Sequence, residues 1–109
     1  MTTQENLYQL VAQIPRGRWI GYGDLGSCCE TPISGLIVGR FMHQCPAGLP
    51  WWRVIGRDGT PLISKLDAKL GLEQLQWLAE EGVEVRDGRA GASSRLTVEE
   101  FVTSIARKM

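Results

Sequence analysis

The 109-residue chain lacks several features that would assign it to a broad class of protein. No apolar run approaches the ~18–20 residues that a membrane-spanning helix needs. The N-terminal residues 1–5 are polar and lack the basic start and apolar run of a secretory signal. The three cysteines are an odd number, so no disulfide framework is expected. We therefore expect one soluble, cytoplasmic domain over residues 1–109, with no membrane partner.

Net charge is also absent, since 12 basic residues balance 12 acidic ones. Residues 1–66 hold six basic and four acidic side chains, a net +2, and the remainder holds six basic and eight acidic, a net −2. This division permits a basic face but does not demand one. Because proteins that bind DNA mainly by electrostatics usually carry a stronger excess, charge alone does not predict a nucleic-acid partner.

Metal ligands are scarce as well. The only histidine, His43, accompanies Cys28, Cys29 and Cys45. A zinc site needs about four ligands at suitable spacing, which this set does not offer. We expect the cysteines to be small buried residues and expect no metal or cofactor.

Helical patterns account for most of the chain. Apolar residues at helical spacing predict helices over residues 3–14, 22–29, 32–44 and 71–81. Thr31-Pro32 is the start signal of the third helix. A last helix begins at Thr97, where Thr97 and Glu100 form a capping box and Leu96 and Phe101 a hydrophobic staple.

Short extended segments lie between the later helices. Residues 52–55 read as a strand, Arg57-Asp58-Gly59 as a turn, and Leu62-Ile63 as the returning strand of a β-hairpin wing. A brief strand follows at residues 83–85, and residues 86–95 read as a linker. The expected fold is mainly α, a winged helix-turn-helix domain with a small β-hairpin wing.

Gly35 and Gly39 lie four residues apart in the third predicted helix. Each costs about 1 kcal/mol relative to alanine in a helix interior. Such a cost marks either a surface that another molecule approaches closely or tight packing between helices.

Several motifs, in order, resemble the DNA-binding domain of O6-alkylguanine-DNA alkyltransferases over residues 7–85. They are Ile14-Pro15-Arg16-Gly17, Tyr22-Gly23-Asp24-Leu25, Val38-Gly39-Arg40 and Leu49-Pro50-Trp51-Trp52-Arg53-Val54-Ile55. The later runs Ile63-Ser64-Lys65 and Glu80-Glu81-Gly82-Val83-Glu84 are similar to the alkyltransferase-like subgroup. The resemblance implies minor-groove binding to duplex DNA and rotation of an alkylated guanine into a pocket.

In the repair enzymes of this family a cysteine thiolate attacks the alkyl carbon, activated by a histidine that a glutamate orients. Trp51 stands at the cysteine position, Trp52 at the histidine position and Glu81 at the glutamate position. Indole offers neither a nucleophile nor a usable base. The resemblance therefore implies a protein that binds the lesion and is not an enzyme.

The resemblance also assigns the expected site residues. The lesion pocket comprises Trp51, Tyr22, Trp52 and Pro50, and the DNA-binding helix contributes Leu36, Arg40, Ser34, Gly35 and Gly39. The alternative interpretation is that Trp51 is a core aromatic residue and that Tyr22 is a half-buried packing residue. For Arg53 we favour an internal ion pair with Glu81.

Two arginines that the resemblance leads one to expect are replaced. Leu36 stands where an arginine fills the hole left by the rotated base, and Leu66 where a second arginine lines the pocket. Either Leu36 acts as an apolar wedge, with Arg40 one turn later supplying charge, or lesion recognition is lost or altered.

The leading hypothesis is a monomer that binds alkylated guanine in double-stranded DNA and flags it for nucleotide excision repair proteins. The alternative is a DNA-binding or protein-interaction module that kept the fold and lost the lesion pocket. A third hypothesis is an enzyme that uses Cys45 or another residue.

Overall fold

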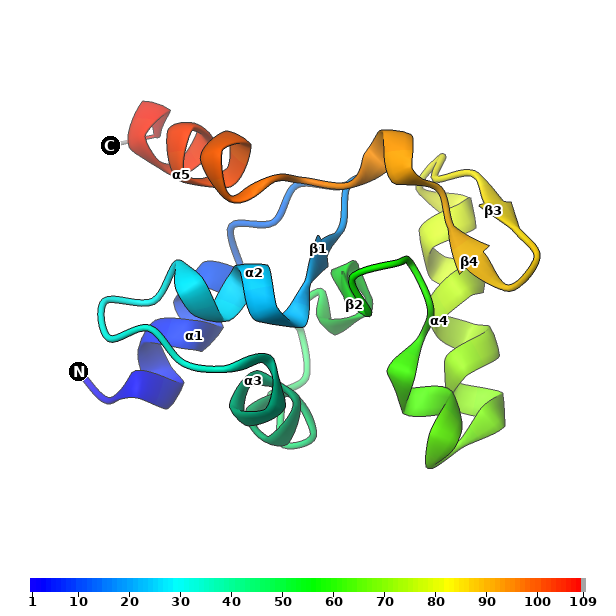
Figure 1. The fold of residues 1–109 in the computed structure, drawn as a ribbon, viewed down its shortest axis with the longest axis horizontal. Coiled ribbons are helices and arrows are strands. Elements are labelled where there is room, and N and C mark those ends of the chain that lie inside the picture. Colours follow the sequence, from blue (N-terminus) through cyan, green and yellow to red (C-terminus); the bar gives the residue numbers. More distant parts are fainter. Residues whose placement is uncertain (109) are drawn as a thin grey trace.

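Residues 1–108 are described by a computed structural model, and within them are five α-helices and two small sheets, one central and one at the edge of the molecule (Figure 1). The helices are α1 (Thr3–Val11), α2 (Tyr22–Ser27), α3 (Gly35–Met42), α4 (Ala68–Glu80) and α5 (Val98–Arg107). The strands are β1 (Ile20–Gly21), β2 (Val54–Ile55), β3 (Val85–Arg86) and β4 (Arg89–Ala90), and 3₁₀ turns cover η1 (Trp51–Arg53), η2 (Leu62–Lys65) and η3 (Ala92–Ser94). None of the helices described has the length and apolar character of a membrane span.

Helices α1 and α5 each begin with a capping box. The Thr97 hydroxyl accepts from the Glu100 N–H, and the Glu100 carboxylate accepts from the Thr97 N–H, each at 3.1 Å. This capping box confirms the predicted start of α5. Helix α1 has the same device at Thr2 and Glu5, but it ends at Val11, and the residues predicted to extend it to position 14 form turns instead.

The predicted start of α3 at Thr31-Pro32 is wrong. Helix α3 begins at Gly35, and the Ser34 hydroxyl caps it by accepting from the Ile37 N–H at 3.3 Å. The Ile33 N–H donates to the Gly26 carbonyl of α2 at 3.1 Å, which holds the preceding residues against α2 in a non-helical path. A side chain at Gly26 would collide with the Ile33 backbone, so this contact requires glycine.

The predicted hairpin between residues 54–55 and 62–63 is also wrong. Strand β2 pairs in parallel with β1, with Ile20 opposite Val54, and residues 62–65 form the turn η2. The hairpin is instead β3–β4, with Arg86 opposite Arg89. Its two turn residues, Asp87 and Gly88, have φ values of 54° and 74°, as a two-residue hairpin loop of type I′ requires.

Residues 86–95 are therefore not a linker. Beyond β4, the Trp19 N–H donates to the Ser94 carbonyl at 3.1 Å, and the Leu96 N–H donates to the Trp19 carbonyl at 2.7 Å. Arg95 forms an ion pair with Asp24 at 2.7 Å. These contacts hold the segment between β4 and α5 against Trp19 and Asp24.

The core consists of two groups of buried side chains. The first packs α1, α2, α3 and α5 together around Leu7, Leu25, Val38 and Phe101. The second packs α4 and the β3–β4 hairpin around Trp19, Ile55 and Leu78. Because β1 and β2 lie between them, the α2–α3 pair is held in a fixed position relative to α4 (Figure 1). The arrangement is the predicted winged helix-turn-helix, with its hairpin at a different place in the sequence.

Candidate nucleic-acid interface

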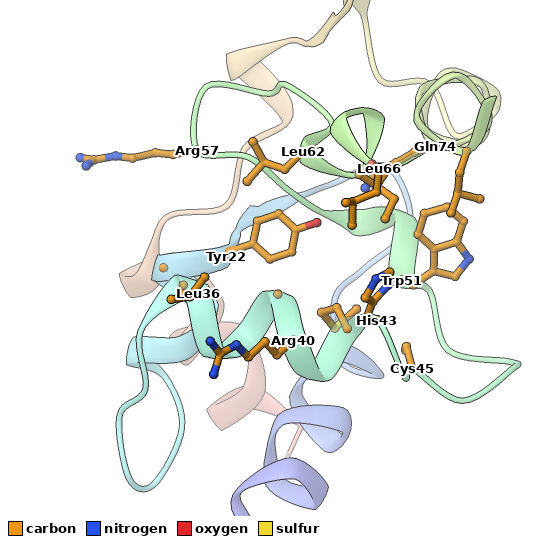
Figure 2. Close-up of a pocket in the computed structure, with 16 residues that line it drawn as sticks. Tyr22, Leu36, Arg40, His43, Cys45, Trp51, Arg57, Leu62, Leu66 and Gln74 are labelled. Carbon is orange, nitrogen blue, oxygen red and sulfur yellow. The ribbon is translucent and has the colours of Figure 1, made fainter. Parts of the chain in front are cut away.

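A cavity of about 830 Å³ opens between α3 and the segment formed by η2 and the start of α4 (Figure 2). This volume lies within the range of small-molecule sites in proteins, roughly 300–1,000 Å³. Most of the lining is apolar. The lining residues that the sequence had singled out are Tyr22, Gly35, Leu36, Gly39, Arg40, Cys45, Trp51 and Leu66.

Tyr22 is the first residue of α2, directly after β1. Its ring extends from α2 into the cavity with the hydroxyl toward the opposite wall (Figure 2). Burial raises the pKa of the Tyr22 phenol, which therefore stays protonated and can donate a hydrogen bond. Tyr22 is thus half-buried and is also part of the cavity wall.

The outer face of α3 presents Leu36 and Arg40 one helical turn apart (Figure 2). The side chain of Leu36 is 70% exposed, which is unusual for a leucine at the rim of a cavity. Ser34, the N-cap, does not line the cavity, and its hydroxyl is engaged with the Ile37 N–H.

The two glycines of α3 have different surroundings. A Cβ at Gly35 would lie 3.1 Å from the Gly23 nitrogen, so Gly35 permits close packing of α3 on α2. A Cβ at Gly39 would meet no atom within 4 Å. Packing inside the protein therefore explains Gly35 and leaves the helix-propensity cost of Gly39 unexplained, as expected of a surface that another molecule approaches.

Trp51 and Trp52 are adjacent in η1 but point to different parts of the molecule. Trp51 lines the cavity, whereas the centroid of the Trp52 ring lies 4.3 Å from the centroid of the Trp77 ring on α4. The Trp52 indole N–H donates to a Glu81 carboxylate oxygen at 3.0 Å. Trp52 is thus partly buried against the second core group, and neither it nor Pro50 lines the cavity, in contrast to the expectation from the sequence.

Arg53, the last residue of η1, links this turn to other parts of the chain. Its guanidinium donates to Glu81, with Nη2 at 2.6 Å from Oε2, and to the Ile14 carbonyl at 2.8 Å. The internal ion pair predicted for Arg53 is therefore confirmed. Burial opposes ionisation of Glu81, but hydrogen bonds from Arg53, the Gly17 N–H and Trp52 outweigh it and hold the pKa of Glu81 below its ordinary value.

Few positive charges remain free at the rim. Arg40 and Arg57 line the cavity and are exposed. Arg18, in contrast, donates to the carbonyls of Ser94 and Arg95 and is paired with Glu100 at 3.2 Å. The opposite rim carries Leu62 and Ile63 of η2, Leu66 directly after it, and Leu70 of α4.

Cys45 and His43 also line the cavity, beside Trp51 (Figure 2). Burial raises the pKa of the Cys45 thiol, which disfavours the thiolate form. Within residues 1–108, no cluster of three or more His, Cys, Asp or Glu side chains is arranged to hold a metal ion.

Gln74 is a lining residue that the sequence reading missed. It lies on α4 at helical spacing from the buried Gly71, Leu75 and Leu78 and is itself only 1% exposed. A single polar residue within a buried apolar stripe was the signal that could have identified it.

Comparisons with known proteins identify the family of this chain. Residues 2–83 match the family model described as "6-O-methylguanine DNA methyltransferase, DNA binding domain". The chain is 36% identical over 83 residues to the DNA base-flipping protein of Escherichia coli K12, covering 74% of this chain and 62% of that protein. It is 31% identical over 83 residues to the DNA base-flipping protein of Vibrio parahaemolyticus, covering 74% of this chain and 80% of that one.

A solved structure gives the same picture. S. pombe Atl1, in complex with damaged DNA containing O6-carboxymethylguanine, superposes with a TM-score of 0.71 at 28% identity, covering 90% of this chain and 91% of Atl1. The family match spans most of the chain. The chain therefore belongs to the family of the 6-O-methylguanine DNA methyltransferase DNA-binding domain and is an alkyltransferase-like protein.

Proposed function

We propose that this protein binds duplex DNA through α3 and holds an O6-alkylated guanine, rotated out of the helix, in the cavity walled by Trp51. The observation that carries the proposal is the large apolar cavity beside an exposed helix face. An aromatic wall suits a flat base by stacking, and an apolar lining suits its alkyl group. The base-flipping names of the relatives and the damaged DNA bound to Atl1 support this use of the site.

The protein acts without transferring the alkyl group. Trp51, at the position that the motif assigns to the acceptor cysteine, carries no nucleophile. Trp52 stands at the histidine position, and its N–H donates to Glu81, which is the carboxylate expected to orient that histidine. The hydrogen bond thus has a structural use in place of a catalytic one. Cys45 is an unfavourable substitute nucleophile, because burial raises the pKa of its thiol.

The bound lesion is then flagged for another pathway, nucleotide excision repair in our proposal. The alternative, a module that has lost its lesion pocket, is less well supported because a cavity with Trp51 and Tyr22 in its wall is present. Leu36 and Leu66 make this cavity more apolar than the resemblance leads one to expect, and few cations surround it. Apolar contacts therefore replace part of the electrostatic attraction to DNA.

The test is a pair of affinities measured at one stated salt concentration, for a duplex with a single O6-methylguanine and for the matching unmodified duplex. Preferential binding of the modified duplex is expected, and equal affinity would exclude damage recognition. A duplex labelled on the alkyl group tests transfer, because label remaining on the protein after denaturation would reveal an enzyme.

A further inference from the structure

Gln74, which is 1% exposed, contributes a buried side-chain amide to the lining of the cavity. Its nitrogen donates to the Val54 carbonyl at 2.8 Å and to the Trp52 carbonyl at 3.3 Å. Both partners are acceptors only, so the amide can sit in one orientation, with the nitrogen toward these carbonyls. The side-chain oxygen must then point the other way.

That oxygen, Oε1, is buried and has no hydrogen-bond partner among residues 1–108. A buried acceptor without a partner is uncommon, because losing its hydrogen bonds to water is not compensated. Gln74 lines the cavity and is held rigidly by its two donated bonds. Oε1 is therefore a fixed acceptor in a site that is otherwise mostly apolar.

An O6-alkylguanine base has one hydrogen-bond donor. Alkylation at O6 removes the proton from N1, so N1, N3, N7 and O6 are all acceptors, and only the exocyclic 2-amino group donates. We propose that Gln74 Oε1 accepts a hydrogen bond from this 2-amino group and so selects guanine-derived lesions among alkylated bases. The inference rests on the proposed function, since it requires the base to enter the cavity.

For the base to reach Gln74, side chains of η2 and of the residue that follows it must move aside. Leu66 is 73% exposed and Leu62 is 41% exposed, and both line the same cavity as Gln74 (Figure 2). Exposed side chains change rotamer within picoseconds to nanoseconds, so their displacement is easy. The 2-amino group then pairs with an acceptor that has no partner in the free protein, so a ligand without this group forgoes that hydrogen bond.

The experiment compares two modified bases that differ only in the 2-amino group, O6-methylguanine and 6-methoxypurine. Each is placed opposite an abasic site, so that no base pair is lost on rotation. Wild-type protein should bind the O6-methylguanine duplex roughly tenfold more tightly, the factor expected from one hydrogen bond to a buried acceptor. Gln74→Met should bring the ratio close to one. Gln76→Met, on the exposed side of the same helix, should leave it unchanged.

Equal binding of the two modified duplexes by wild-type protein would overturn the proposal. An unchanged ratio in Gln74→Met would overturn it as well. The wild-type comparison needs no variant, so the proposal remains testable if Gln74→Met does not fold. Unmodified guanine also carries the 2-amino group, so preference for O6-methylguanine over guanine tests the proposed function separately. Loss of that preference alone would exclude lesion recognition and leave the Gln74 contact standing.

Discussion

Replacing Leu36 by alanine should weaken binding to DNA containing O6-methylguanine without weakening the fold. Complete burial of a leucine side chain contributes about 1.5–3 kcal/mol. Leu36 is 70% exposed in the free protein, so most of that contribution is still available when the side chain enters the base stack. The expected loss is about 1–2 kcal/mol, or roughly 5- to 30-fold in the dissociation constant.

The assay is a fluorescence titration of a labelled duplex, with thermal unfolding measured in parallel. Leu72→Ala is the matched control, because Leu72 is 63% exposed on α4 but does not line the cavity. It should change the affinity less than about twofold, and both variants should unfold within about 0.5 kcal/mol of wild type. Because leucine carries no charge, the salt dependence of binding should be the same in Leu36→Ala as in wild type.

The wedge hypothesis for Leu36 would be refuted if Leu36→Ala bound the modified duplex as tightly as wild type. An equal loss in Leu72→Ala would also refute it, because the effect would then reflect general surface hydrophobicity. In either case the second account of the missing arginine, altered lesion recognition, would be favoured.

Other predictions follow from the same contacts. Gly39→Ala should raise the free energy of unfolding by about 0.5–1 kcal/mol, because the space is open, yet weaken DNA binding; Gly35→Ala should destabilise the protein instead, because of its contact with α2. Arg53→Met should lower the free energy of unfolding in urea by about 3–5 kcal/mol by leaving a buried carboxylate unpaired. Arg86→Met, which breaks an exposed pair, should change it by less than about 1 kcal/mol, and similar effects of the two would contradict the burial argument. The pKa of Glu81 is lower in the folded protein than the ordinary 4.5, so its contribution to stability is complete above pH 4.5 and is lost as pH falls through the folded pKa. Glu81→Gln should flatten the dependence of stability on pH below 4.5, and an unchanged acid profile would show that other carboxylates dominate.

Local signals predicted much of the secondary structure. The capping box of Thr97 and Glu100 marked the start of α5, since both halves of the motif lie within one helical turn. The internal ion pair of Arg53 with Glu81 was also anticipated. The errors arose where a local signal competed with contacts distant in the sequence. Thr31-Pro32 resembles a helix start, but the bond from Ile33 to Gly26 keeps this segment out of the helix.

The hairpin shows the same limit. Val54 and Ile55 read as one strand of a hairpin, yet their partner is β1, more than thirty residues earlier in the chain. The Asp87-Gly88 signal of the true hairpin was present in the sequence but was read as part of a linker. Strand periodicity identifies extended segments and does not identify their partners, because pairing is decided by which apolar faces can be buried together.

The sequence by itself determined the family, and it has an indole, which carries no thiolate, at the position that the resemblance gives to the acceptor cysteine. It also has Leu36 at a position where the resemblance leads one to expect an arginine. Only the tertiary structure decided that Trp52 packs beside Trp77 and away from the cavity, that Gly39 faces open space and that Gln74 lies at the cavity with one free acceptor. These facts depend on which side chains meet across elements far apart in the chain, and neighbouring residues such as Trp51 and Trp52 can take opposite roles when the backbone turns between them.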